Sequence, residues 1–108
     1  MTPLDLHVEE MAGQARISLR GELDVSSSPA LRDLIVRLVS EGRTKLVIDC
    51  DGLAFVDSTG LGVFVGARAR ALAANGSVTL ESVRPALARL LSVTGMDGLF
   101  TPTAVPAA

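Results

Sequence analysis

The chain has 108 residues, a length that suits one domain and is too short for two. Hydrophobic residues make up 48% of it and charged residues 20%, so the chain can build a core and is not expected to be disordered. Aromatic residues are only 3% and the formal net charge is -2. These values argue against base-stacking platforms and against a basic surface, so no nucleic-acid partner is expected.

The chain contains one cysteine, Cys50, and one histidine, His7. An intramolecular disulfide and a zinc site built from cysteine and histidine are therefore excluded, and we expect no metal and no cofactor. Cys50 is predicted to be a small buried hydrophobe. The N-terminus lacks the pattern of a signal peptide, and no apolar stretch is long enough for a membrane helix. We expect a cytoplasmic protein without a membrane partner.

The first half of the chain predicts a hairpin followed by a helix. Apolar and polar residues alternate over residues 4–10 and 15–19, with Gly13 between the two stretches. Ser28 before Pro29 marks a helix start, because the hydroxyl can cap and the proline fits the first turn. Apolar residues then recur at helical spacing until Gly42 ends the helix (Leu31, Leu34, Ile35 and Leu38).

The second half predicts alternating strands and helices. Residues 45–48 form a short β-branched run, and Asp51-Gly52 after it is expected to be a turn. Residues 53–64 are ambiguous by propensity alone, but the apolar spacing beyond Gly66 favours a helix. The remaining elements are a helix from just after Asp57 to near Asn75, a strand at 77–82, a helix at 85–94 and a last short strand at Leu99-Phe100.

This order predicts an α/β domain over residues 1–100. The sheet is expected to be mixed, with about five strands and about three packed helices, because the initial hairpin is antiparallel and the later strands are joined through helices. Residues 101–108, rich in proline and small side chains, are expected to be a frayed tail.

A polar cluster, Asp57-Ser58-Thr59-Gly60, interrupts two apolar flanks where a strand leads into a helix. Helix capping by Asp57 or Ser58 is one explanation. A catalytic serine is disfavoured, because His7 lies in the hairpin and Val56 occupies the place of the first glycine in G-x-S-x-G. A dimeric aspartic protease is also disfavoured, since two residues separate Asp57 from Gly60. No catalytic residue is predicted.

The same cluster could accept a phosphate. A serine in the first turn of a helix is exposed, and the helix N-terminus stabilises added negative charge. Phosphorylation would add about -1.5 to -2 charges there. A partner surface complementary to a neutral hydroxyl would be disturbed by that charge.

Residues 53–62, Leu-Ala-Phe-Val-Asp-Ser-Thr-Gly-Leu-Gly, closely resemble the signature of the bacterial anti-sigma factor antagonists of the STAS domain family. The resemblance extends from about Gln14 to Phe100. It includes Gly-Glu-Leu-Asp at 21–24, Leu-Val-Ile-Asp at 46–49, and the stretch from Arg84-Pro85 to Gly95-Met-Asp-Gly-Leu99.

The resemblance implies a phosphorylation-controlled binding protein and not an enzyme. Ser58 would be the phosphoacceptor, and the partner would be an anti-sigma factor that is also a serine kinase. The unphosphorylated protein would bind this partner and release the sigma factor. Phosphorylation would end the binding, and a PP2C-type phosphatase would reset it.

The resemblance also assigns roles to the neighbours of Ser58. Asp57, Thr59 and Gly60 would shape its loop and help to face the partner, with Glu22 and Asp24 beside the serine on the same face. Gly62, four residues before Gly66, would permit a close approach of a partner backbone or, more simply, close packing of the helix on the sheet.

Other roles of STAS domains stay open at this point. They are a stressosome-like scaffold, an accessory subunit of lipid transport, and a small-ligand sensor. The first two tend to use an acceptor threonine or none, which favours the antagonist. A sensor would need an internal pocket, and the sequence gives no sign of one.

Overall fold

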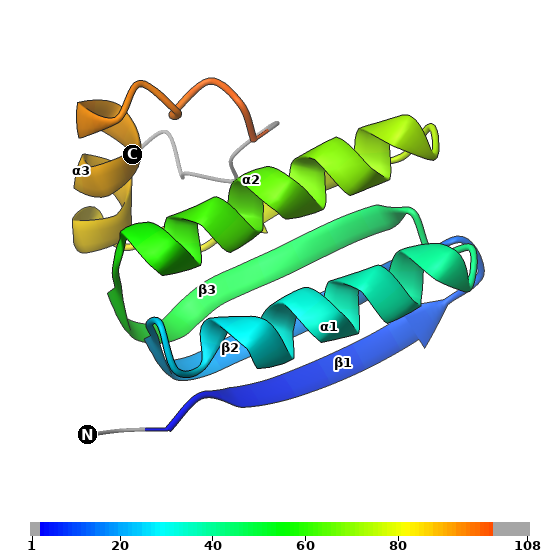
Figure 1. The fold of residues 1–108 in the computed structure, drawn as a ribbon, viewed down its shortest axis with the longest axis horizontal. Helices are drawn as coiled ribbons and strands as arrows, with labels where there is room; N and C mark the ends of the chain where they lie inside the picture. Colours follow the sequence, from blue (N-terminus) through cyan, green and yellow to red (C-terminus); the bar gives the residue numbers. More distant parts are fainter. Residues whose placement is uncertain (1–2, 101–108) are drawn as a thin grey trace.

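The computed structural model describes residues 3–100 as a sheet with helices packed against it (Figure 1). The sheet order is β1-β2-β3-β4. β1 pairs antiparallel with β2, whereas β2–β3 and β3–β4 are parallel pairs, so the predicted mixed α/β class is confirmed. The elements are β1 (Asp5–Met11), β2 (Gln14–Leu23), α1 (Ser28–Ser40), β3 (Lys45–Val56), α2 (Ser58–Ala73), β4 (Ser77–Glu81) and α3 (Pro85–Val93).

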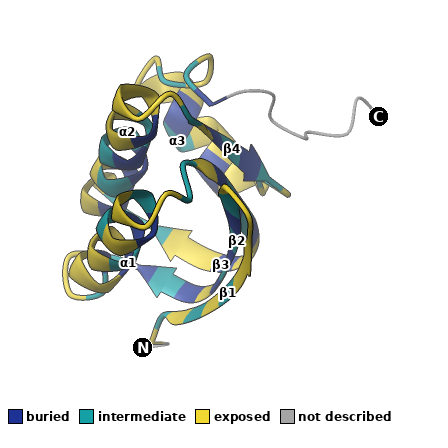
Figure 2. Cartoon of the chain, turned by 90° about the vertical axis from the view of Figure 1, so that its right-hand side faces the viewer, coloured by how far each residue is buried: buried dark blue, intermediate teal, exposed yellow. Residues whose placement is uncertain are grey.

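The helices bury one face of the sheet. α1 and α2 lie side by side across it, and α3 lies at the end where β3 stops (Figure 1). Alternate strand residues turn toward the helices, and these buried positions form the core seen in dark blue in Figure 2. Their side chains are mainly aliphatic, as the composition requires; they include Ile17, Leu19, Leu23, Leu46, Ile48 and Leu80.

The other face of the sheet is polar. Arg16 on β2 pairs there with Glu81 on β4 at 2.6 Å and with Asp49 on β3 at 3.4 Å. These residues alternate with core positions along their strands, so the charges lie away from the helices. Such partly exposed ion pairs add little stability, but they mark this face as one that contacts water.

The predicted fifth strand is wrong within the described residues, which hold four strands. Leu99 and Phe100 form a bend, because the Leu99 carbonyl and the Phe100 ring make contacts outside the sheet. The Arg68 guanidinium donates to the Leu99 carbonyl at 2.7 Å, and the Phe100 ring packs edge-on against Phe64 with centroids 6.4 Å apart. Phe100 therefore closes the core instead of extending the sheet.

The turn predicted at Asp51-Gly52 is also wrong, because β3 continues through it to Val56. Gly52 pairs with Arg20 of β2, at a position where the register between the two strands shifts. A Cβ on Gly52 would lie 2.7 Å from the Leu19 carbonyl oxygen. The glycine is thus explained by a close approach of two strands and not by a turn.

The predicted hairpin, the second helix after Asp57 and its end near Asn75 are confirmed. The first helix begins at Ser28 as predicted, but Ser28 does not cap it. Its hydroxyl donates back to the Asp24 carbonyl at 2.6 Å, and Ser27 occupies the N-cap position.

Over residues 3–100, no helix is long and apolar enough to cross a membrane. In that same part of the chain, no three metal-binding side chains cluster. The predicted tail at 101–108 lies outside the described residues.

Burial should make the Cys50 thiol unreactive. It is 1% exposed, and burial, aided by the charge of Asp49, raises its pKa to about 12. The unfolded thiol has the lower pKa, so folding favours the protonated form and this contribution to stability is lost as the pH rises from about 9 toward 12. At pH 8, a disulfide reagent is expected to label Cys50 only after denaturation, whereas a thiol introduced by Ser92→Cys on exposed α3 should react at once. Equal labelling rates would show that the core opens at this strand.

Candidate phosphoacceptor site

Two parallel strands bring the predicted site residues to one edge of the sheet. Leu23 at the end of β2 is paired with Val56 at the end of β3. The Asp57 backbone N–H then donates to the Leu23 carbonyl at 3.2 Å. The chain segments that follow, Asp24 on one side and Asp57-Ser58 on the other, are therefore neighbours, at the carboxyl ends where open α/β sheets place their functional loops.

Asp57 caps helix α2. Its backbone is extended, and its carboxylate accepts from the Gly60 N–H at 3.0 Å, which satisfies one free donor of the first turn. Gly60 is buried beneath this turn, where a Cβ would lie 2.7 Å from Leu23 Cγ and 3.0 Å from Val56 Cγ2. The aspartate and the glycine thus fix the start of α2 against the ends of both strands.

Ser58 is the first residue of α2 and is exposed, as is Thr59 after it. The capping role considered for Ser58 is filled by Asp57 instead. Within residues 3–100, the Ser58 hydroxyl has no hydrogen-bond partner, so it is free for chemistry. It lies at the positive end of a sixteen-residue helix, where added negative charge is stabilised.

Asp24 holds the loop that leads into α1. Its Oδ1 accepts from the Ser26 hydroxyl at 2.8 Å and from the Ser26 and Ser27 N–H groups at 3.0 and 3.1 Å. The hydrogen bonds from the Ser26 hydroxyl and the Ser27 backbone lower the pKa of this carboxylate. Asp24 therefore lies at the same edge as Ser58, but its charged oxygen is engaged in shaping its own loop.

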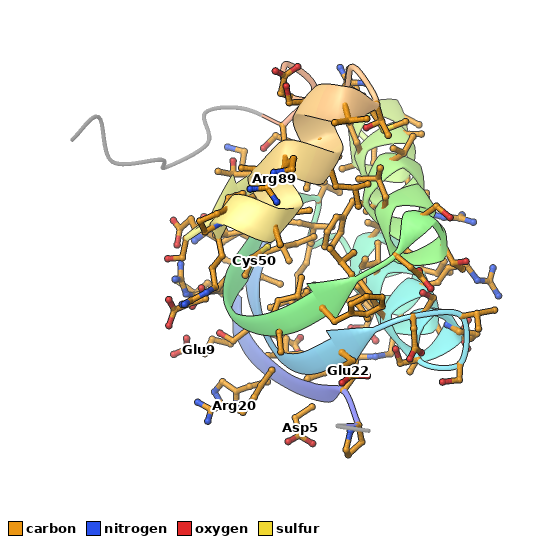
Figure 3. The ribbon with its side chains drawn as sticks, turned by 90° about the vertical axis from the view of Figure 1, so that its left-hand side faces the viewer. Asp5, Glu9, Arg20, Glu22, Cys50 and Arg89 are labelled. Carbon is orange, nitrogen blue, oxygen red and sulfur yellow. The ribbon has the colours of Figure 1, made fainter. Side chains whose placement is uncertain are left out.

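Glu22 lies at this edge too, near the end of β2 in Figure 3. Gly21 and Leu23 on either side of it are buried, so strand alternation turns the Glu22 side chain to the sheet face away from the helices. Glu22 and Ser58 thus lie at one edge of the sheet, with Glu22 on its outer side, and their common contact with a partner stays a prediction.

Two exposed apolar side chains flank the site and were not predicted from the sequence. Val25, directly after Asp24, is 70% exposed, and Phe55, the β3 partner of Glu22, is 49% exposed. Their apolar character alone would have placed them in the core. Exposed apolar side chains at this end of the sheet are typical of a protein-contact surface.

Gly62 and Gly66 do not pack closely on the sheet, so that prediction is wrong. Gly62 is exposed and Gly66 half-buried, and a Cβ on either would meet nothing within 4 Å. They line an open groove of about 210 Å³ between α1 and α2, with Thr59 at its wall and Arg32 and Arg70 among its polar residues.

Comparison with known proteins shows the family of the chain. The family model described as "Mlab, STAS domain" matches residues 6–102. The chain belongs to the STAS domain family. An anti-sigma-B factor antagonist of Bacillus subtilis is 34% identical over 97 residues, covering 90% of this chain and 88% of that protein. The resemblance inferred from the sequence to STAS-domain anti-sigma factor antagonists is confirmed.

Solved STAS structures share the fold. An anti-sigma factor antagonist from Mycobacterium paratuberculosis is 29% identical, covers 93% of this chain and 84% of its own, and superposes with a TM-score of 0.80. The Bacillus cell fate determinant SpoIIAA in its phosphorylated form is 22% identical, covers 94% and 93%, and has a TM-score of 0.76. At that identity the second likeness concerns the fold alone.

Substitutions at the start of α2 should separate structural from functional residues of this STAS domain. Gly60→Ala is expected to cost about 1–3 kcal/mol of unfolding free energy by overpacking, and Asp57→Ala about 1 kcal/mol by loss of the cap. Ser58→Ala should change the free energy of unfolding by less than about 0.5 kcal/mol, because the Ser58 hydroxyl makes no hydrogen bond within residues 3–100. Urea unfolding measures all three, and Asp57→Asn, which keeps an acceptor, is the control. A loss for Ser58→Ala as large as for Asp57→Ala would contradict this assignment.

Proposed function

We propose that this STAS domain is an anti-sigma factor antagonist controlled by phosphorylation of Ser58. In the unphosphorylated state it binds an anti-sigma factor that is also a serine kinase, and the sigma factor is released. Phosphate on Ser58 ends this binding, and a PP2C-type phosphatase removes it. The chain contributes a binding surface and a hydroxyl, while the catalysis belongs to its partners.

The free Ser58 hydroxyl is the observation that carries the proposal. It is exposed at the start of α2, where the Asp57 cap and the close packing of Gly60 hold the helix in place. A kinase can therefore modify Ser58 without dismantling the helix start. The Bacillus subtilis relative, named as an anti-sigma-B factor antagonist, supports the same role.

The local chemistry explains why phosphate would act on the partner and not on the fold. The first-turn amides of α2 favour an anion, and repulsion from Asp57 across water is on the order of 1 kcal/mol. Neither effect approaches the stability of a typical domain, about 5–15 kcal/mol. In a complex, however, a doubly charged group would lose its water next to the Asp57 carboxylate.

Ser58 is predicted to be the single phosphoacceptor. The chain is incubated with ATP and the kinase-type anti-sigma factor encoded nearest to its gene, and peptide mass spectrometry maps the phosphate. The phosphorylated protein and Ser58→Glu should lose partner binding by more than about a hundredfold, which corresponds to roughly 3 kcal/mol. Ser58→Ala should still bind.

Backbone NMR provides the control. Amide shifts should change on phosphorylation only near residues 52–66 and stay fixed in the β1–β2 hairpin and α3. Phosphate on Thr59 with Ser58 unmodified would reject the site. Unchanged binding after phosphorylation would favour a STAS scaffold over a switch.

Glu22 offers a second test, because its carboxylate lies at the site edge and supports no described loop. Reversing its charge is expected to slow association with a basic partner surface about three- to tenfold and to weaken the salt dependence of the rate. Asp24 is left intact, since its substitution would release the loop before α1. The matched control is Glu9→Lys. Glu9 lies on the same sheet face, opposite Arg16 in the strand register, at the other end of β2. Equal stopped-flow rates for Glu22→Lys and wild type would remove Glu22 from the interface.

A further inference from the structure

Within residues 3–100, no segment of the chain fills the groove between α1 and α2. Its lining is mostly apolar, with Ile35 from α1 and Val63 from α2, and it holds about 210 Å³. Thr59, the residue after the phosphoacceptor, forms part of its wall, so the groove begins where the Ser58 site ends. Figure 1 shows α1 and α2 running side by side above the sheet along this seam.

The glycines that open the groove are not required by any contact with residues 3–100. Gly60, by contrast, is required by contacts with Leu23 and Val56. Gly62 and Gly66 have helical backbones and open space where a Cβ would be, so alanine would fit and would favour the helix. Because these two glycines have no side chain, the groove between the helices stays open.

The polar residues of the groove are cationic. In the described part of the chain, the one ion pair of Arg32 is with its sequence neighbour Asp33, at 3.2 Å, and both side chains are more than half exposed. Among the residues that the structure describes, no ion pair engages Arg70. The groove thus joins an apolar floor to two guanidinium groups, whereas the sheet edge beside Ser58 carries Glu22, Asp24 and Asp57. The two surfaces have opposite charge.

We propose that this groove binds a segment of the anti-sigma factor that presents a large aliphatic side chain flanked by carboxylates. The aliphatic side chain fills the space above Gly62 and Gly66, and the carboxylates pair with Arg32 and Arg70. This inference rests on the proposed function and adds a second contact, on the helix face, to the one at Ser58.

The test compares binding and phosphorylation for wild type and groove variants with the same kinase-type anti-sigma factor. Gly66→Leu fills the groove and should raise the Kd at least tenfold. Arg70→Glu should slow association and reduce its salt dependence. For Ser58 phosphorylation, Gly66→Leu should raise KM about tenfold with kcat unchanged, because Gly66 lies about two helical turns along α2 from the reacting hydroxyl.

Matched controls separate groove effects from general ones. Ala69→Leu adds the same bulk at an exposed position of α2 outside the groove. Lys45→Glu makes the same charge reversal on the other face of the sheet. Both should bind like wild type, and thermal unfolding should show Gly66→Leu to be at least as stable as wild type.

The outcomes distinguish the two proposals. If the wild-type chain does not bind the anti-sigma factor, the proposed function is wrong and the groove assignment falls with it. If wild type binds, Ser58→Glu does not, and both groove variants bind like wild type, only the groove assignment is overturned. Sedimentation velocity adds a third result: a wild-type dimer that Gly66→Leu dissociates would make a second copy of the chain the occupant and reject an anti-sigma factor segment.

Discussion

The parallel pairing of β2 with β3 is the constraint on which the site depends. It places Leu23 opposite Val56 and lets the Asp57 N–H donate to the Leu23 carbonyl. Two loops that are more than thirty residues apart in the sequence thereby meet at one edge. Their position is set by backbone hydrogen bonds in the buried part of the sheet, so neither loop has to support the other. A loop side chain that holds no turn or cap, such as Ser58, is consequently free to serve recognition.

Residues that lie close together at this edge of the sheet have different roles. Asp57 caps α2, Gly60 allows the helix to sit on Leu23, and Asp24 fixes the turn before α1. Ser58 lies between these anchored residues with an unused hydroxyl. Phosphorylation there would add charge to an already stable helix start without removing any contact that forms it. A serine that also capped the helix would couple modification to unfolding, and the structure avoids that coupling.

The sequence predicted the elements better than their ends. The apolar periodicity is local information, so it correctly located the hairpin, all three helices and the start of β3, the strand that precedes the polar cluster at residues 57–60. Gly52 and Leu99-Phe100 were misjudged because the reasons for them are contacts with distant residues: Leu19 across the sheet, and Arg68 and Phe64 on α2. Composition could not show that Val25 and Phe55 are exposed or which way Glu22 points. Likewise, Gly62 and Gly66 have the spacing of a packing stripe, and only the open space above them shows that they do not pack.

The two surfaces also differ in how they respond to phosphate. Ser58 and Arg70 are twelve residues apart on one helix, about 18 Å at the usual rise per residue. Charges in water are largely screened beyond roughly 8 Å at physiological ionic strength. Phosphate on Ser58 therefore leaves the electrostatics of Arg70 almost unchanged, while it alters the edge that contains Asp57. A partner held at both places would lose the contact at the edge and keep its attraction to the helix face. The edge would then determine whether binding occurs, and the groove would determine which anti-sigma factor is bound.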